Sequence, residues 1–133
     1  MINIKTEIYD HVYTTLKDRY PKMNITGEAT PTPSHFPCVQ IIGLNNTVVS
    51  STQTQSAKEN HASLLYQIDI FSNKQSGRMA ECDEISGVID EIFADLNFNR
   101  IFMAPTQNAS EGIYRVTARY TAVVDRYGML YRR

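Results

Sequence analysis

The chain has 133 residues, which suits one compact domain and leaves no room for two of ordinary size. Hydrophobic residues make up 42% of it and charged residues 20%, which supports a buried core and excludes a chain disordered by composition. The net charge of −1 argues against a dedicated nucleic-acid binder, since such proteins are usually strongly basic.

The first predicted element is an amphipathic helix over residues 4–19. Its apolar positions recur every four residues: Ile8, Val12 and Leu16. Pro21 ends the helix, because the residue before a proline avoids helical geometry. Glycine and prolines punctuate residues 22–37, so we expect a surface crossing there, with a short strand at Met23–Thr26.

β-branched residues dominate the next part of the chain. They predict a strand at Cys38–Leu44, a turn at Asn45-Asn46, and a polar, uncharged β run at Thr47–Gln55. A second long strand is predicted at Ala62–Ser72, after a turn or loop at Ser56–His61. Residues 45–61 therefore form either a β arm that projects from the domain or an ordinary polar sheet edge.

The second predicted helix covers residues 77–97 and is the most clearly amphipathic. Ser76 or Ser72 is a candidate N-cap. One face is apolar: Cys82, Ile85, Ile89, Phe93 and Leu96. The outer face is acidic: Glu81, Asp83, Glu84, Asp90, Glu91 and Asp95. Six carboxylates on an exposed helix are ordinary composition, so a hard-cation site is the less favoured interpretation.

Two or three further strands follow the second helix. We expect one at residues 98–109, with Pro105 near an edge, and the strongest of the chain at Ile113–Asp125. Met129–Tyr131 forms either a short last strand or part of a projecting tail over 127–133. This order predicts a single α+β domain spanning 1–133, with two layers: a mainly antiparallel sheet and two helices packed on one of its faces.

The near-zero net charge conceals a division along the chain. Residues 1–114 carry 8 basic and 13 acidic side chains, a balance of −5, whereas residues 115–133 carry five arginines and one aspartate, a balance of +4. Such a division favours contact with other copies of the chain or with an acidic partner. Because the two patches are unlike, they suit a head-to-tail contact, which closes into a ring or continues as a filament.

The sequence offers no catalytic, cofactor-binding or metal-binding residues that we would assign. It lacks a phosphate-binding glycine loop, a nucleophile elbow and a zinc-protease motif. His35 and Cys38 are three residues apart, but they lack two further ligands at a recognisable spacing. Without a secretory leader or a membrane-spanning stretch, we expect Cys38 and Cys82 to be buried thiols in a protein made in the cytoplasm.

Several segments together resemble the tail terminator (tail completion) proteins of long-tailed bacteriophages. The segments that carry the resemblance are IYDHVYTTLKDRYP, TPSHFPCVQI, NHASLLYQIDIFSN, SGRMAECDEISGVIDEIFADLNF and YRVTARYTAVVDRYGMLYRR. The resemblance implies an α+β subunit of the virion that forms a ring, usually a hexamer, on the head-proximal end of a finished tail tube. It also implies partners in the tube protein and the head connector, passage of DNA without specific binding, and no enzymatic activity.

The residues themselves, rather than the family, suggest where subunits meet. The predicted interface consists of the basic C-terminal end and the acidic helix face: Arg115, Arg119, Arg126, Tyr127, Met129, Leu130, Tyr131, Arg132, Arg133, Glu84, Glu91 and Asp95. In one arrangement Arg115, Arg119 and Arg126 face a neighbour's acidic helix. In the other, the acidic helix lines the channel and repels phosphate.

Three other functions stay open at this stage. The first is a head-side neck or connector protein, which has a similar size and likewise catalyses no reaction. A small α+β enzyme or ligand-binding domain requires a pocket with convergent polar groups. A nucleic-acid binder that uses the basic strand requires affinity that falls steeply with salt.

Overall fold

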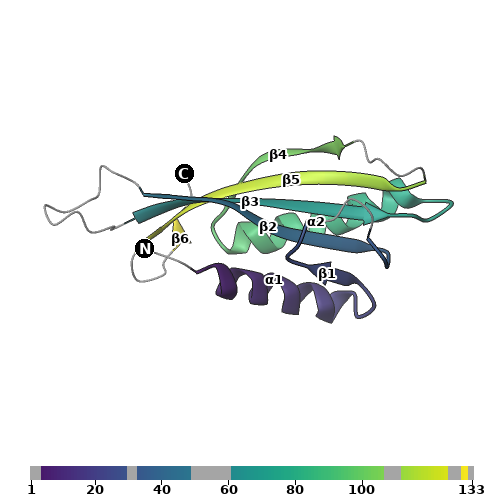
Figure 1. The fold of residues 1–133 in the computed structure, drawn as a ribbon, viewed down its shortest axis with the longest axis horizontal. Coiled ribbons are helices and arrows are strands. Elements are labelled where there is room, and N and C mark those ends of the chain that lie inside the picture. The colour runs from purple at the N-terminus through teal and green to yellow at the C-terminus, as the bar shows by residue number, and fades with distance from the viewer. Residues whose placement is uncertain (1–3, 30–32, 49–60, 107–111, 126–129, 132–133) are drawn as a thin grey trace, which may run out of the picture.

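The computed structural model describes residues 4–29, 33–48, 61–106, 112–125 and 130–131. Figure 1 shows the helices beside a long, twisted sheet. The elements in chain order are α1 (Lys5–Arg19), β1 (Asn24–Thr26), β2 (Cys38–Val48), β3 (His61–Ser72), α2 (Arg78–Asp95), β4 (Asn99–Thr106), β5 (Tyr114–Asp125) and β6 (Leu130–Tyr131). The α+β class with a mainly antiparallel sheet, expected from the sequence, is confirmed.

The sheet has the strand order β1-β2-β3-β5-β4, and β6 pairs with β5 beyond the end of β4. Only β1 and β2 run parallel. β3 is the central strand, because it pairs with β2 on one side and along its whole length with β5 on the other. Strands far apart in sequence therefore form the middle of the sheet.

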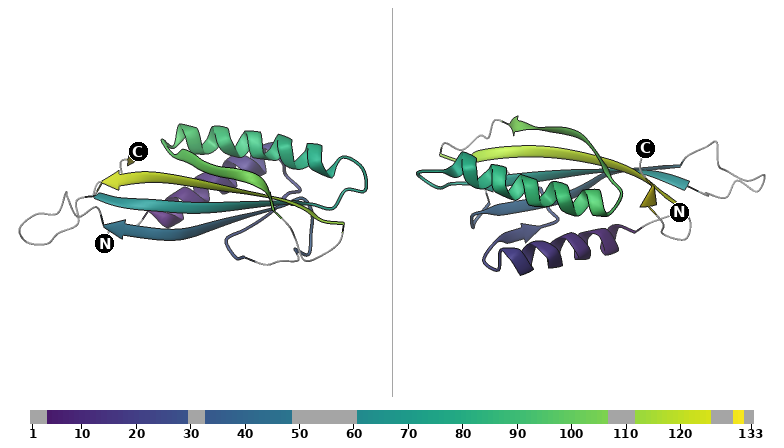
Figure 2. Two further views of the ribbon diagram at one scale, coloured as in Figure 1. Left: turned by 90° about the horizontal axis from the view of Figure 1, so that it is seen from above. Right: turned by 180° about the vertical axis from the view of Figure 1, so that it is seen from behind.

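The helices cover one side of this sheet. Figure 2 shows α1 and α2 on the same side, with α2 running along β3 and β5. The side chains that α1 buries are Ile8, Val12 and Leu16, as its periodicity predicts. Together with the buried residues of α2 and alternate residues of the strands, they form one hydrophobic cluster.

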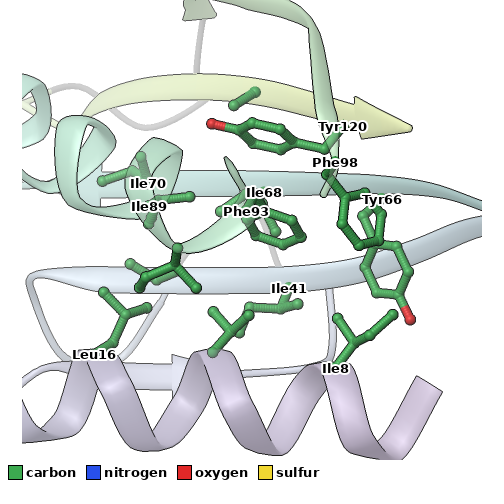
Figure 3. Close-up of a cluster of buried hydrophobic side chains, with 14 of the residues drawn as sticks. Ile8, Leu16, Ile41, Tyr66, Ile68, Ile70, Ile89, Phe93, Phe98 and Tyr120 are labelled. Atoms are coloured by element: carbon green, nitrogen blue, oxygen red, sulfur yellow. The ribbon is translucent and has the colours of Figure 1, made fainter. Parts of the chain in front are cut away.

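An aromatic group forms the middle of the core (Figure 3). The ring of Phe93 in α2 stacks on that of Tyr120 in β5, with 4.5 Å between ring centroids. The ring of Phe98 meets those of Phe93 and Tyr66 edge to face. Such pairs stabilise a core beyond the apolar area they bury, and here they fix α2 against the two inner strands.

Two local predictions are wrong. The expected turn at Asn45-Asn46 does not occur, since both residues continue β2 and pair with Leu65 and Leu64 of β3. A bulge between Gly43 and Asn45 accommodates one extra residue, and the ladder continues to Val48. The described part of the expected arm thus belongs to the sheet, and residues 49–60 lie outside the described part.

The N-terminus of α2 also differs from its prediction. Neither serine caps the helix: Gly77 is the N-cap residue, in a left-handed conformation with φ of 87° and without a side-chain capping bond. Ser72 is buried and donates its hydroxyl proton to Glu81 Oε1 at 2.6 Å. This bond ties the first turn of α2 to the end of β3.

Candidate functional site

The outer face of α2 is acidic. Glu84, Glu91 and Asp95 are all exposed, and their spacing of seven and four residues places them along one stripe of the helix. The opposite stripe, with Cys82, Ile85, Ile89 and Phe93, is buried. We call the three exposed carboxylates the acidic α2 face. Within the described part of the chain, the Tyr20 hydroxyl donates a hydrogen bond of 3.3 Å to Glu84 Oε1 on this face.

Two carboxylates predicted for this outer face are instead bonded within the subunit. Asp90 Oδ1 accepts a hydrogen bond from the Tyr120 hydroxyl at 3.1 Å and forms an ion pair with Arg100 at 3.3 Å. Glu81 contacts Ser72 and forms an ion pair with Lys74. Burial, and secondarily the charge of Asp90, raises the pKa of Tyr120 far above its ordinary value. These groups fasten α2 to the sheet.

The arginines of β5 lie on the other side of the sheet. Side chains alternate along a strand, so Val116, Ala118 and Tyr120 point to the helices while Arg115 and Arg119 point away from them. We call this second surface of the sheet the helix-free face. The strand predicted at Ile113–Asp125 thus has its arginines on the face away from the core.

Arg115 is bonded within its own subunit. Its Nε and Nη2 atoms each lie 3.1 Å from Oδ1 of Asp69 on β3, whose side chain is only 2% exposed. Its guanidinium also lies over the ring of Phe71, 5.4 Å from the centroid. Thr117 and Gln67 donate further hydrogen bonds to the Asp69 carboxylate, at 2.6 Å and 3.0 Å. Arg115 therefore neutralises a buried charge.

Arg119 is the exposed arginine of this strand. Its Nε donates a hydrogen bond of 3.1 Å to Gln67 Oε1, and its guanidinium lies 5.6 Å from the centre of the Phe102 ring. Phe102 itself is 44% exposed, and Ile101 beside it is 57% exposed. We call Arg119, Phe102 and Ile101 the arginine–aromatic patch. An exposed guanidinium held over an exposed aromatic ring is a suitable contact for a protein partner.

The sequence predicted Arg119 for this surface but missed Phe102, Ile101 and Asp69. Phe102 and Ile101 lie at a bulge of β4, where the register shifts between Arg100 and Phe102. No sequence pattern predicted this bulge. Asp69 lies 46 residues before Arg115. Its partner follows only from the pairing of β3 with β5, which the sequence does not specify.

The other predicted interface residues lie at the C-terminal end. Leu130 is half-buried, packs against the core, and accepts a hydrogen bond of 3.2 Å on its carbonyl oxygen from Asn97 Nδ2. Tyr131 pairs with Val123 in β6, so the short last strand is confirmed. The remaining predicted residues lie outside the described part of the chain: Arg126, Tyr127, Met129, Arg132 and Arg133.

The candidate metal ligands and nucleophiles are either far apart or buried. Among the described residues, no three His, Cys, Asp or Glu side chains gather in a way that could hold a metal ion. Cys38 and Cys82 are free, buried thiols. Burial raises the pKa of Cys38 to about 11 and that of Cys82 to about 12, so neither is a ready nucleophile near neutral pH.

No protein-family model matches this chain, and no curated protein matches it either. Within the described ranges, neither helix has the length and apolar character needed to cross a membrane. The features of this chain that bear on function are therefore the acidic α2 face, the arginine–aromatic patch and the sheet between them.

Proposed function

We propose that this protein is a structural subunit of a bacteriophage virion, a tail terminator that caps the head-proximal end of the tail tube as a ring. A hexamer is the expected stoichiometry. In this role the ring ends tube polymerisation, presents a surface to the head connector, and lets DNA pass without binding it specifically. The subunit performs no covalent chemistry.

One observation carries the proposal: the acidic α2 face and the exposed Arg119 lie on opposite sides of the subunit. The acidic α2 face is exposed on the side of α2 opposite its buried stripe, and Arg119 lies on the helix-free face of the sheet. Surfaces of opposite charge on opposite sides attract copies head to tail, and repetition of such a contact closes a ring when the rotation allows it.

Polar groups bonded within the subunit also support a structural role. Asp69, Arg115 and Thr117 bond to one another within the sheet, and Asp90 bonds to the sheet from α2. Fully bonded networks of this kind rigidify a fold. A rigid subunit with unlike outer faces suits a ring that must fit two different partners.

The experiment that tests the proposal measures assembly directly. The purified chain is examined by native mass spectrometry and by negative-stain electron microscopy, and we expect closed rings of one stoichiometry. Replacing Glu84, Glu91 and Asp95 together with lysine should convert the rings to monomers, because it turns attraction into repulsion. A matched control replaces three exposed carboxylates elsewhere and changes the charge equally: Asp10, Asp18 and Glu28 to lysine.

Each result has a defined meaning. A chain that stays monomeric up to its solubility limit, or that forms only open polymers, contradicts the ring-cap function. Rings that survive the triple substitution, together with new binding to double-stranded DNA, would place the acidic α2 face in the channel. Loss of rings in the control variant as well would show that total charge matters rather than this face.

A further inference from the structure

One glycine on α2 has no explanation within the subunit. Gly87 is exposed, has ordinary helical geometry, and a Cβ atom added to it would have no neighbour within 4 Å. Glycine inside a helix weakens it relative to alanine. Gly27 and Gly43, in contrast, would bring an added Cβ to 3.4 Å from Tyr9 and 3.6 Å from Lys5. At Gly87 the open space lies outside the molecule.

The position of Gly87 places it within the acidic α2 face. It follows Glu84 by three residues and precedes Glu91 by four, so the three residues adjoin on the helix surface. Because glycine has no side chain, the helix between the two carboxylates carries no side-chain atoms at this position, and we call the open space beside Gly87 the notch.

The arginine–aromatic patch offers the opposite charge and an exposed apolar side chain. Phe102 and Ile101 are two of the largest exposed apolar side chains among the described residues, and Arg119 lies over the Phe102 ring. Burying exposed aromatic surface favours association, and an arginine at its rim pairs well with carboxylates. The patch thus offers an apolar side chain beside a cation, and the notch offers a space between two anions.

We propose that Phe102 of one copy docks at Gly87 on α2 of the next copy, with Arg119 paired to Glu84 or Glu91. This deepens the proposed function and rests on it, because it names the contact that joins neighbouring subunits. A second copy is the occupant that charge complementarity selects. The two surfaces lie on opposite sides of one subunit, so every copy offers one of each.

The decisive variants fill the notch without harming the fold. Gly87→Ala and Gly87→Leu should raise the melting temperature, by roughly 3 °C for alanine, because helix propensity improves and nothing in the subunit clashes. The same variants should weaken association, by roughly tenfold or more for leucine. A glycine with only a structural role would not separate the two effects in this way. Met79→Leu, exposed on the same helix away from the stripe, is the control.

Cross-linking identifies the two sides of the contact. Gly87→Cys and Phe102→Cys chains are purified separately, mixed and oxidised mildly, and we expect a disulfide between the two variants. The native thiols stay out of this reaction because both are buried. Met79→Cys mixed with Phe102→Cys is the control, and we expect little cross-linking between these two.

The outcomes separate this inference from the proposed function. Rings that persist in Gly87→Leu but are lost in the triple lysine variant overturn the docking of Phe102 and leave the ring cap intact. Open polymers that Gly87→Leu abolishes support the docking and overturn the ring cap. Phe102→Cys chains that cross-link among themselves overturn the docking in favour of a two-fold contact.

Discussion

Asp69 and Arg115 are diagonal neighbours across the β3–β5 ladder, and both guanidinium contacts reach the same carboxylate oxygen, Oδ1. The ladder pairs Asp69 with Thr117 and Arg115 with Phe71, so the ion pair crosses two rungs. Asp69, taken as a whole residue, is 1% exposed. The pair therefore places a negative charge in a part of the sheet from which solvent is nearly excluded. It makes the register of the two inner strands costly to change.

Asp69→Asn should destabilise the protein by about 2–3 kcal/mol, because Arg115 and Thr117 lose a charged acceptor in a buried place. Urea unfolding at neutral pH measures the difference. Asp18→Asn, on α1 and outside the proposed interface, is the control, and this exposed substitution should stay within about 0.5 kcal/mol of the parent chain. Equal losses in the two variants would contradict the role assigned to Asp69.

Gly77→Ala should have the opposite effect on stability to Gly87→Ala. Gly77 has a φ of 87°, which costs a residue with a Cβ atom about 1 kcal/mol even in open space. Gly87 is helical, so alanine there should add up to about 1 kcal/mol. Thermal unfolding of the two variants, compared with the parent chain, measures the direction of each change in stability. A gain in both would show that the left-handed cap is not required.

Alkaline pH should weaken the fold through its two thiols. Their pKa is 9.0 when unperturbed, but burial raises it to about 11 for Cys38 and about 12 for Cys82, where Glu81 and Asp83 add to the effect. The folded chain therefore keeps protons that the unfolded chain releases. The free energy of unfolding is unaffected by the thiols below about pH 9 and falls as pH rises from there towards the folded values.

Urea unfolding in a reducing buffer between about pH 8 and about pH 10 checks this slope. Cys82→Ala should make the slope shallower, although the variant is less stable overall, because one group that titrates only on unfolding has been removed. A slope unchanged by this substitution would mean that the thiol is protonated equally in both states.

Association should weaken with salt and with loss of Arg119. Raising the ionic strength from about 0.05 M to about 0.5 M screens exposed charges, so sedimentation velocity should show smaller species in high salt. Arg119→Glu should have a stronger effect than Arg100→Glu, since Arg100 forms an ion pair with Asp90 inside the subunit. Assembly that strengthens with salt would instead indicate an interface governed by apolar contact.

Local periodicity predicted most of this fold. The alternation in Ile113–Asp125 predicts which side chains of β5 meet the helices, and the four-residue repeats predict the buried stripes of α1 and α2. The turn predicted at Asn45-Asn46 was wrong. Asparagine favours turns locally, but here both residues pair with β3 and remain extended. Tertiary pairing thus outweighed a local preference.

The candidate site was harder to predict than the fold. Exposure of Glu84, Glu91 and Asp95 follows from helical geometry alone. The hydrogen bonds from Arg115 to Asp69 and from Tyr120 to Asp90 depend on which elements are neighbours and on the register of the strands. Those contacts join residues 46 and 30 positions apart, and no periodicity within one segment contains that information.

The central place of β3 has a consequence for biosynthesis. Its inner neighbour β5 comes last among the long strands, so a ribosome releases β1, β2, β3 and both helices before the sheet can be completed. Until residues 114–125 emerge, the apolar row of β3 has one open edge, and closing it requires a non-local step that is slow compared with helix formation. A chain that ends before residue 114 would leave this edge of β3 unpaired and would leave the Asp69 carboxylate without Arg115 and Thr117.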